Sequence, residues 1–275
     1  MKIALMDSGI GLLPAAAAVR RLRPDADILL SNDPDGMPWG PRTPEDLTGR
    51  AVDVALAAAA HRPQALIVAC NTATVHALPA LRAALEPGIP VIGTVPAIKP
   101  ASAAGGKVAI WATPATTGSA YQRGLIRDFA DGAEVTEVPC PGLADAVEHA
   151  DPDAVDAAVA AAAALTPTDV RAVVLGCTHY ELVEERIVAA LEARRRAGLP
   201  PIVFHGSADA VAAQALRRIG AEPAPDADPT GTLSVLLSGR PGQLPAPALG
   251  YAEGRALAAT AAAHRASPDH LAPAR

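Results

Sequence analysis

The sequence predicts an α/β protein with parallel sheets, and three features of the chain support that expectation. Short apolar runs alternate with Ala-rich stretches of helical length throughout the 275 residues, which is the order expected of strands and crossover helices. The segment 96–106 separates two such series, so the chain is expected to fold in two halves. Each half contains an apolar run that ends in a cysteine, Cys70 in one and Cys177 in the other.

Each element is placed by its composition and by the turn residues that bound it. The first strand, 2–6, is a short apolar run that ends at the polar Asp7-Ser8-Gly9. Similar runs predict strands at 27–30, 65–69, 90–93, 107–112, 134–138, 172–175, 202–204 and 232–237. Alanine loses no side-chain entropy in a helix, so the Ala-rich stretches predict helices. These are expected at 13–22, 45–61, 73–85, 153–165, 181–197 and after Leu249.

The composition argues against several classes of protein. The formal net charge is −6, whereas a surface that binds nucleic acid normally needs a basic field. No apolar run is long enough for a membrane span, and the first strand follows Met1-Lys2 without the apolar core of a secretory signal. Three widely spaced cysteines do not form a disulfide framework, so the expected setting is a reducing cytoplasm with free thiols.

Cys70 and Cys177 are the strongest candidates for chemistry. A buried cysteine is often only a small apolar residue, and that interpretation would be preferred for either thiol alone. Both cysteines, however, follow an apolar strand and precede a helix, where backbone N–H groups and the helix dipole stabilise a thiolate. Ligands of open α/β sheets bind beyond the carboxyl ends of the strands, so the two thiols are expected to face each other across a cleft. Cys140 is interpreted as structural.

Other polar residues close to these strand ends have both structural and functional interpretations. In the structural interpretation, Asp7 or Ser8 caps a helix. In the functional one, Asp7 lies beside one thiol and Ser8 contacts the substrate. His179 follows Cys177 by two residues and is placed to relay a proton for it. Glu148 has no local signal, and its pattern is typical of a solvated helix residue. No H-E-x-x-H motif, paired C-x-x-C motif or Walker loop is present, so neither a metal nor a nucleotide cofactor is expected.

Five motifs together resemble the glutamate racemases of the aspartate/glutamate racemase superfamily. In chain order they are Asp7-Ser8-Gly9-Ile10-Gly11, Pro38-Trp39-Gly40, Cys70-Asn71-Thr72-Ala73, the turn 113–116 and Gly176-Cys177-Thr178-His179-Tyr180. Their order and spacing hold from Met1 to about Ala221, and the two cysteine motifs together are highly specific.

The resemblance implies two doubly wound, flavodoxin-like domains related by a pseudo-twofold axis, with the active site in the cleft between them. One domain would comprise 1–98 and 207–275, and the other 99–206. The resemblance is also compatible with a homodimer.

The resemblance further implies a reaction without a cofactor or a metal. Cys70 and Cys177 would deprotonate and reprotonate the α-carbon of glutamate from opposite faces, supplying D-glutamate for peptidoglycan. Asp7 would assist Cys70, while His179 and Glu148 would assist Cys177. The residues expected to line the substrate are Ser8, Pro38, Trp39, Gly40, Asn71, Thr72, Thr113, Thr116 and Thr178.

The chain departs from the family pattern in three places. It has Gly11-Leu12 where the family has a Gly-Gly pair, and Asp35-Gly36 where the family has an Ala-Arg pair. Trp39 replaces a tyrosine that lies at the pocket rim in the family. The turn between Thr116 and Tyr121 is about one residue short.

Two alternative functions stay open: a racemase of aspartate or another polar amino acid, and a non-catalytic binding module descended from the enzyme. No arginine lies within the motifs, which favours glutamate, and the presence of both thiols argues against a binding module.

Overall fold

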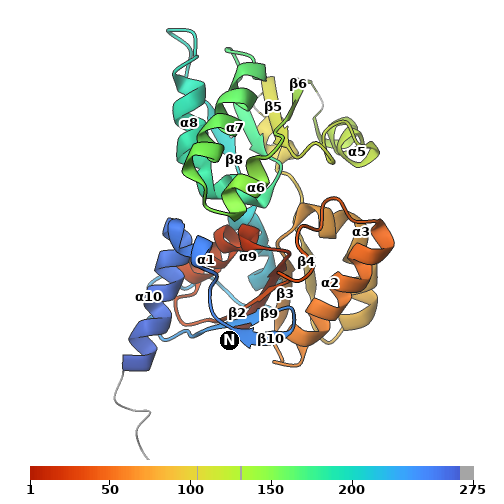
Figure 1. Cartoon of the computed structure of the whole chain (residues 1–275), viewed down its shortest axis with the longest axis vertical. Coiled ribbons are helices and arrows are strands. Elements are labelled where there is room, and N and C mark those ends of the chain that lie inside the picture. The colour runs from red at the N-terminus through yellow and green to blue at the C-terminus, as the bar shows by residue number, and fades with distance from the viewer. Residues whose placement is uncertain (104, 131, 267–275) are drawn as a thin grey trace, which may run out of the picture.

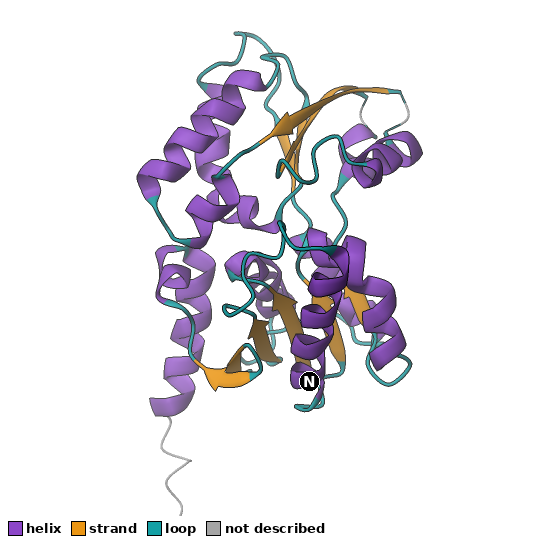
Figure 2. Ribbon diagram, turned by 45° about the vertical axis from the view of Figure 1, so that its right-hand side comes forward, coloured by secondary structure: helices purple, strands orange, loops and turns teal. Residues whose placement is uncertain are grey.

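The chain folds around two sheets, as seen in a computed structural model that describes residues 1–103, 105–130 and 132–266 (Figures 1 and 2). The first sheet has six strands in the order β10-β9-β2-β1-β3-β4. Its strands are β1 (Lys2–Asp7), β2 (Asp27–Asn32), β3 (Ala65–Val68), β4 (Val91–Gly93), β9 (Leu233–Leu237) and β10 (Arg240–Gly242). All neighbours in this sheet are parallel except β9 and β10.

The second sheet has four parallel strands in the order β6-β5-β7-β8. They are β5 (Gly106–Ala112), β6 (Ala133–Pro139), β7 (Ala172–Leu175) and β8 (Val203–His205). When the strands are counted from the start of each sheet, both sheets contain the order 2-1-3-4, as in the flavodoxin-like arrangement. The prediction of an α/β fold with two similar parallel sheets is therefore confirmed.

Helices connect the strands and cover the sheets. The α-helices are α1 (Leu13–Leu22), α2 (Pro44–Ala59), α3 (Asn71–Leu85), α4 (Ile98–Ser102), α5 (Ala120–Phe129), α6 (Leu143–Glu148), α7 (Pro152–Leu165), α8 (Glu184–Glu192), α9 (Ala208–Arg218) and α10 (Ala252–Ala266). Three short 3-10 helices are η1 (Ile10–Leu12), η2 (Thr178–Val183) and η3 (Ala246–Gly250). None of the helices in the described part of the chain has the length and apolar character that crossing a membrane requires.

Several of these elements differ from the expected ones. Helices α4, α5, α6 and α9 and strand β10 were not predicted. Two of them, α4 and α6, have only five and six residues, which is too short for a helical pattern to develop. The helix expected over 181–197 starts as the 3-10 helix η2 and ends at Glu192, ahead of Gly198 with its φ of +83°.

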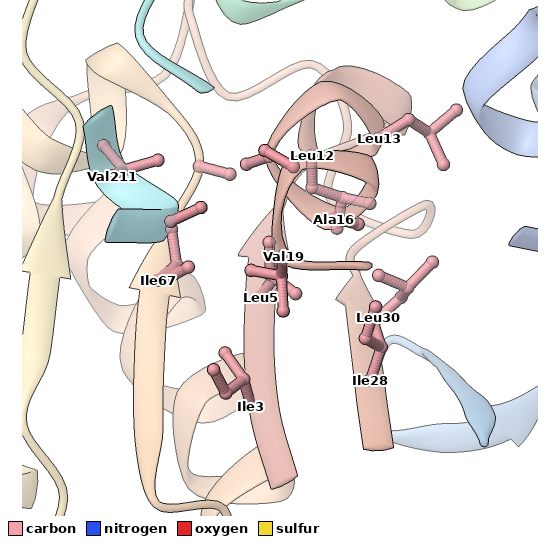
Figure 3. Close-up of a cluster of buried hydrophobic side chains, with 14 of the residues drawn as sticks. Ile3, Leu5, Leu12, Leu13, Ala16, Val19, Ile28, Leu30, Ile67 and Val211 are labelled. Carbon is pink, nitrogen blue, oxygen red and sulfur yellow. The ribbon is translucent and has the colours of Figure 1, made fainter. Parts of the chain in front are cut away.

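The alternation of side chains along the first sheet explains why helices cover both of its faces. Ile3 and Leu5 of β1 point into one core, where they pack with α1 and α9 (Figure 3). Ala4 and Met6 point the other way, into a second core formed with α2 and α3. Because both faces are buried, the central strands are apolar at successive positions, which made them recognisable in the sequence.

The predicted site residues follow the carboxyl ends of four strands. Asp7 ends β1 and Cys70 follows β3, and these two strands are neighbours in the first sheet. Thr113 follows β5 and Cys177 follows β7, which are neighbours in the second sheet. Each pair thus lies at the point where the strand order reverses, the usual ligand site of such folds.

Candidate active site

Asp7 is buried at the edge of the first sheet beside Cys70. It is 1% exposed, and hydrogen bonds from the Cys70 side chain and the Ser8 backbone partly offset the effect of burial on its pKa. Burial raises the pKa of Asp7 to about 6 against the opposing charge of His179, and the charge of Glu148 adds to the increase. A carboxyl group that titrates near neutrality can accept and release a proton at working pH.

The Cys70 thiol is held in its protonated form. Burial and the charge of Asp7 raise its pKa well above the ordinary value, although the backbone N–H of Ala73 in α3 lowers it. The expected stabilisation of a thiolate by the helix N-terminus is therefore outweighed by desolvation. The charge of Cys177 also raises this pKa. A protonated thiol is the form required of a proton donor.

Cys177, His179 and Glu148 form a connected series. The Sγ atom of Cys177 lies 3.8 Å from Nδ1 of His179, and Nε2 of that ring lies 2.8 Å from Oε2 of Glu148. Burial lowers the pKa of His179, but its hydrogen bonds to Cys177 and Glu148 outweigh burial and keep the pKa well above its ordinary value. An imidazolium beside a sulfur is the arrangement that favours a reactive thiolate.

Glu148 lies in this series and not on a solvated face. Its side chain is 12% exposed, which corrects the interpretation drawn from its pattern. The Oε2 atom also accepts a hydrogen bond from the backbone N–H of Ile10 at 2.8 Å. The carboxylate therefore joins the segment after β1 to the segment after β7. A contact between such distant segments could not be predicted from the local sequence pattern.

Asn32 is a residue near the site that the sequence analysis missed. It ends β2, where the register pairs it with Asp7 of β1. Its side-chain amide donates a hydrogen bond to the carbonyl of Gly9, so the Gly9–Ile10 peptide is held on one side by Asn32 and on the other by Glu148. Polar residues directly after the apolar run of β2 were the available signal.

A further contact joins the two cysteine motifs directly. The side-chain amide of Asn71 donates to the carbonyl of Gly176 at 2.6 Å. Asn71 follows Cys70 and Gly176 precedes Cys177, so this hydrogen bond fixes one motif against the other. The Oδ1 atom of Asn71 has no partner among the described residues, and it leaves a buried acceptor between the two motifs.

Gly11 is required where η1 packs against η2. An ideal Cβ at this position would lie 2.5 Å from Oγ1 of Thr178 and 2.6 Å from Cε1 of His179. Both distances are far shorter than a van der Waals contact, so any side chain here would displace the Thr178 hydroxyl and the His179 ring.

We expect the substitution Gly11→Ala to reduce kcat about 100-fold, because displacement of a catalytic group by about 1 Å has an effect of this size. Steady-state kinetics of the racemisation that the resemblance implies measure it. The matched control is Gly49→Ala in α2, where no atom lies within 4 Å of the added Cβ. We expect Gly49→Ala to keep the wild-type kcat, and full activity in Gly11→Ala would contradict the packing argument.

The loop before Pro38 is held by the buried carboxylate of Asp33. It accepts hydrogen bonds from the indole N–H of Trp39 at 2.9 Å and from Nε of Arg50 at 2.9 Å. The Trp39 side chain is only 1% exposed, so it lies in the core and not at the pocket rim as expected. An ideal Cβ at Gly36 would lie 1.9 Å from Nε of Arg50. Arg50 thus occupies the space of a side chain at the position where the family pattern has arginine.

The other residues expected to contact substrate are distributed around these groups. Ser8 and Thr178 are buried, and the hydroxyls of Thr113 and Thr116 are 3.2 Å apart. Thr72 is partly exposed, whereas Pro38 and Gly40 are exposed. Their contact with substrate stays a prediction.

Cys140 lies inside the core of the second sheet, against which Cys177 also packs. It is 1% exposed, and burial raises its pKa to about 12. A thiol this deeply buried has little thiolate at neutral pH, which fits the structural role expected of it.

Comparison with known proteins identifies the family. The sequence profile of the Asp/Glu/Hydantoin racemase family matches residues 13–215. Glutamate racemase of Roseiflexus sp. (strain RS-1) is 36% identical over 192 residues, which is 68% of this chain and 70% of that protein. Glutamate racemase of Vibrio campbellii is 38% identical over 194 residues, 69% of this chain and 72% of that protein.

A solved structure agrees with these sequence matches. Escherichia coli glutamate racemase, crystallised with L-glutamate and the activator UDP-MurNAc-Ala, superposes with a TM-score of 0.71 at 27% identity. The superposition covers 86% of this chain and 90% of that one. The chain therefore belongs to the Asp/Glu/hydantoin racemase family.

Proposed function

We propose that this protein is a glutamate racemase that interconverts L-glutamate and D-glutamate with two thiols and no cofactor. The observation that carries the proposal is the pair of strand-end cysteines, each with its own acid/base partner: Asp7 for Cys70, and His179 with Glu148 for Cys177. Its curated relatives are glutamate racemases, which supports glutamate as the substrate. The product would supply D-glutamate for peptidoglycan in the cytoplasm.

The proposed reaction exchanges one proton at the α-carbon. The sulfur on one face takes the α-proton as the C–H bond breaks, and the thiol on the other face donates its proton to the carbanion. The acceptor sulfur ends protonated and the donor sulfur ends as a thiolate, so the enzyme is ready for the reverse direction. Asp7 would take up the thiol proton of Cys70 when that group must act as the base, and His179 would serve Cys177 in the same way.

The developing carbanion needs stabilisation in a site that excludes water. The hydroxyls of Ser8 and Thr178 and the backbone N–H groups after Cys70 are candidates for binding the substrate carboxylates. The unpartnered Oδ1 atom of Asn71 suits the substrate ammonium group. We infer further that the parts of the chain around the two sheets, 1–98 with 207–275 and 99–206, are domains that enclose the substrate between them.

Circular dichroism of the purified protein with single enantiomers tests the proposal. The samples are L-glutamate, D-glutamate and both enantiomers of aspartate, each without added cofactor. Loss of optical activity from both glutamate enantiomers is the expected result. Turnover of aspartate alone would contradict glutamate as the substrate, and turnover of none would contradict the racemase reaction.

Alkylation by iodoacetamide should inactivate the protein through Cys177 before the other thiols. Cys177 is partly exposed, whereas Cys70 and Cys140 are buried and burial raises the pKa of each. Bound glutamate should protect the protein, because it would cover the sulfur. Peptide mass spectrometry locates the label, and inactivation by label at Cys140 alone would contradict the assignment.

A further inference from the structure

The C-terminal segment reaches the candidate active site from outside the range that matches the family. The family profile ends at residue 215, whereas η3 and α10 span 246–266. Figure 1 shows α10 in blue on the side of α1, with its upper end directed toward the green α6. At that end the hydroxyl of Tyr251 donates a hydrogen bond to the backbone carbonyl of Val147 at 2.6 Å.

Val147 immediately precedes Glu148, whose carboxylate contacts His179 and Ile10. Glu148 is the last residue of α6, a helix of only six residues, and Ala150 beyond it has a φ of +51°. So short a helix gives its last residue little support from its own hydrogen bonds. The carbonyl of Val147 accepts local hydrogen bonds from the N–H groups of His149 and Ala150, the latter at 3.0 Å. Tyr251 adds a hydrogen bond to this carbonyl from a distant part of the chain.

Tyr251 is itself held firmly enough to act as an anchor. It lies between η3 and α10, where its N–H bonds to the carbonyl of Ala248 at 3.2 Å and its carbonyl accepts from Arg255. Ala248 and Leu257 on either side are buried in the core of the first sheet. The ring of Tyr251 packs against that core and also against the core of the second sheet.

We propose that Tyr251 is a positioning residue, whose hydroxyl fixes the Val147 carbonyl and so holds the Glu148 carboxylate against His179. The peptide between Val147 and Glu148 is planar, so fixing its carbonyl also fixes the direction in which Glu148 leaves the helix. Glu148 is then held from both ends by the part of the chain around the first sheet, through Tyr251 at its backbone and Ile10 at its carboxylate.

The substitution Tyr251→Phe tests the proposal because it removes the hydroxyl and keeps the ring. The first measurement is the pKa of the His179 imidazole, followed by NMR and assigned with His179→Gln. Loosening of the Glu148 hydrogen bond lowers this pKa, and we expect a decrease of about half a unit to one unit. This measurement needs no substrate.

The second measurement is racemisation, which rests on the proposed function. We expect kcat to fall about 5- to 10-fold, the usual consequence of losing one hydrogen bond, with KM changed less than about twofold. The matched control is Thr166→Val, which removes a buried hydrogen bond to the indole N–H of Trp111 in the core of the second sheet. It should lower thermal stability and leave kcat and the His179 pKa unchanged.

The outcomes separate the inference from the function. Wild-type kcat and an unchanged His179 pKa in Tyr251→Phe would overturn the positioning role while the racemase reaction stands. Equal losses in Tyr251→Phe and Thr166→Val would also overturn it, because general destabilisation would then explain both. If the wild-type protein racemises no amino acid, the proposed function fails, and the His179 pKa still decides the role of Tyr251.

Discussion

Replacement of either proposed base, Cys70→Ala or Cys177→Ala, is expected to reduce racemisation about 10⁴-fold, because each would remove a group that transfers a proton in the proposed reaction. The two variants should nevertheless differ from each other. Each retains one sulfur, which can still remove the α-proton from the single enantiomer that presents it to that face. Solvent exchange in D₂O, followed by proton NMR, should therefore label one enantiomer in Cys70→Ala and the opposite one in Cys177→Ala.

The control for this experiment is Cys140→Ala, which changes a third thiol inside the core of the second sheet. We expect its racemisation rate to stay within about threefold of wild type, since Cys140 lies outside the proton path. Exchange of the same enantiomer by both single-thiol variants would contradict the assignment of one base to each face. Full racemisation by either variant would contradict the two-thiol mechanism altogether.

The substitution Asp7→Asn should change activity and stability in opposite directions. Burial raises the pKa of Asp7 to about 6, so folding makes its ionised form less favourable than in the unfolded chain. The folded state therefore binds more protons between about pH 4 and pH 6, and the free energy of unfolding falls as the pH rises through this window. The ionised carboxylate costs about 3 kcal/mol at pH 7.5, and asparagine should recover about 1 to 3 kcal/mol of this.

The same titration of Asp7 should affect kcat in the opposite direction to stability. The wild-type kcat should decrease below about pH 6, where Asp7 becomes protonated and can no longer accept a proton from Cys70. Asp7→Asn should reduce kcat about 100-fold at pH 7.5 and abolish this acidic limb of the profile. Urea unfolding and kinetics between pH 5 and pH 8 measure both effects. A variant that is less stable than wild type at pH 7.5, or that keeps the acidic limb, would refute this role of Asp7.

The sequence by itself determined the fold class and the chemical groups at the strand ends. Buried parallel strands are apolar over consecutive residues, and such runs were visible at β1, β3, β5 and β7 without any knowledge of their neighbours. Because parallel strands end at one edge of a sheet, placing Cys70 and Cys177 after two of these runs was enough to predict a site. The motifs around them were also sufficient to recognise the family.

Only the tertiary structure decided how these groups act on one another. Contacts between distant segments leave no periodic trace in the sequence, so the bonds from Ile10, His179 and the Asn71 amide were not predictable from local pattern. Glu148 shows this most clearly, since its local pattern is that of a solvated helix residue and its partners, Ile10 and His179, lie in distant segments of the chain.

Burial decided the protonation states for the same reason. The helix N-terminus at Cys70 favours a thiolate, but the loss of solvent and the charge of Asp7 reverse that preference. Trp39 was expected at the pocket rim, but it lies in the core, where its indole N–H donates a hydrogen bond to the buried carboxylate of Asp33. The sequence was thus sufficient to predict that Cys70 and Cys177 lie at strand ends. Their acid and base properties depend on how closely the folded chain packs around them.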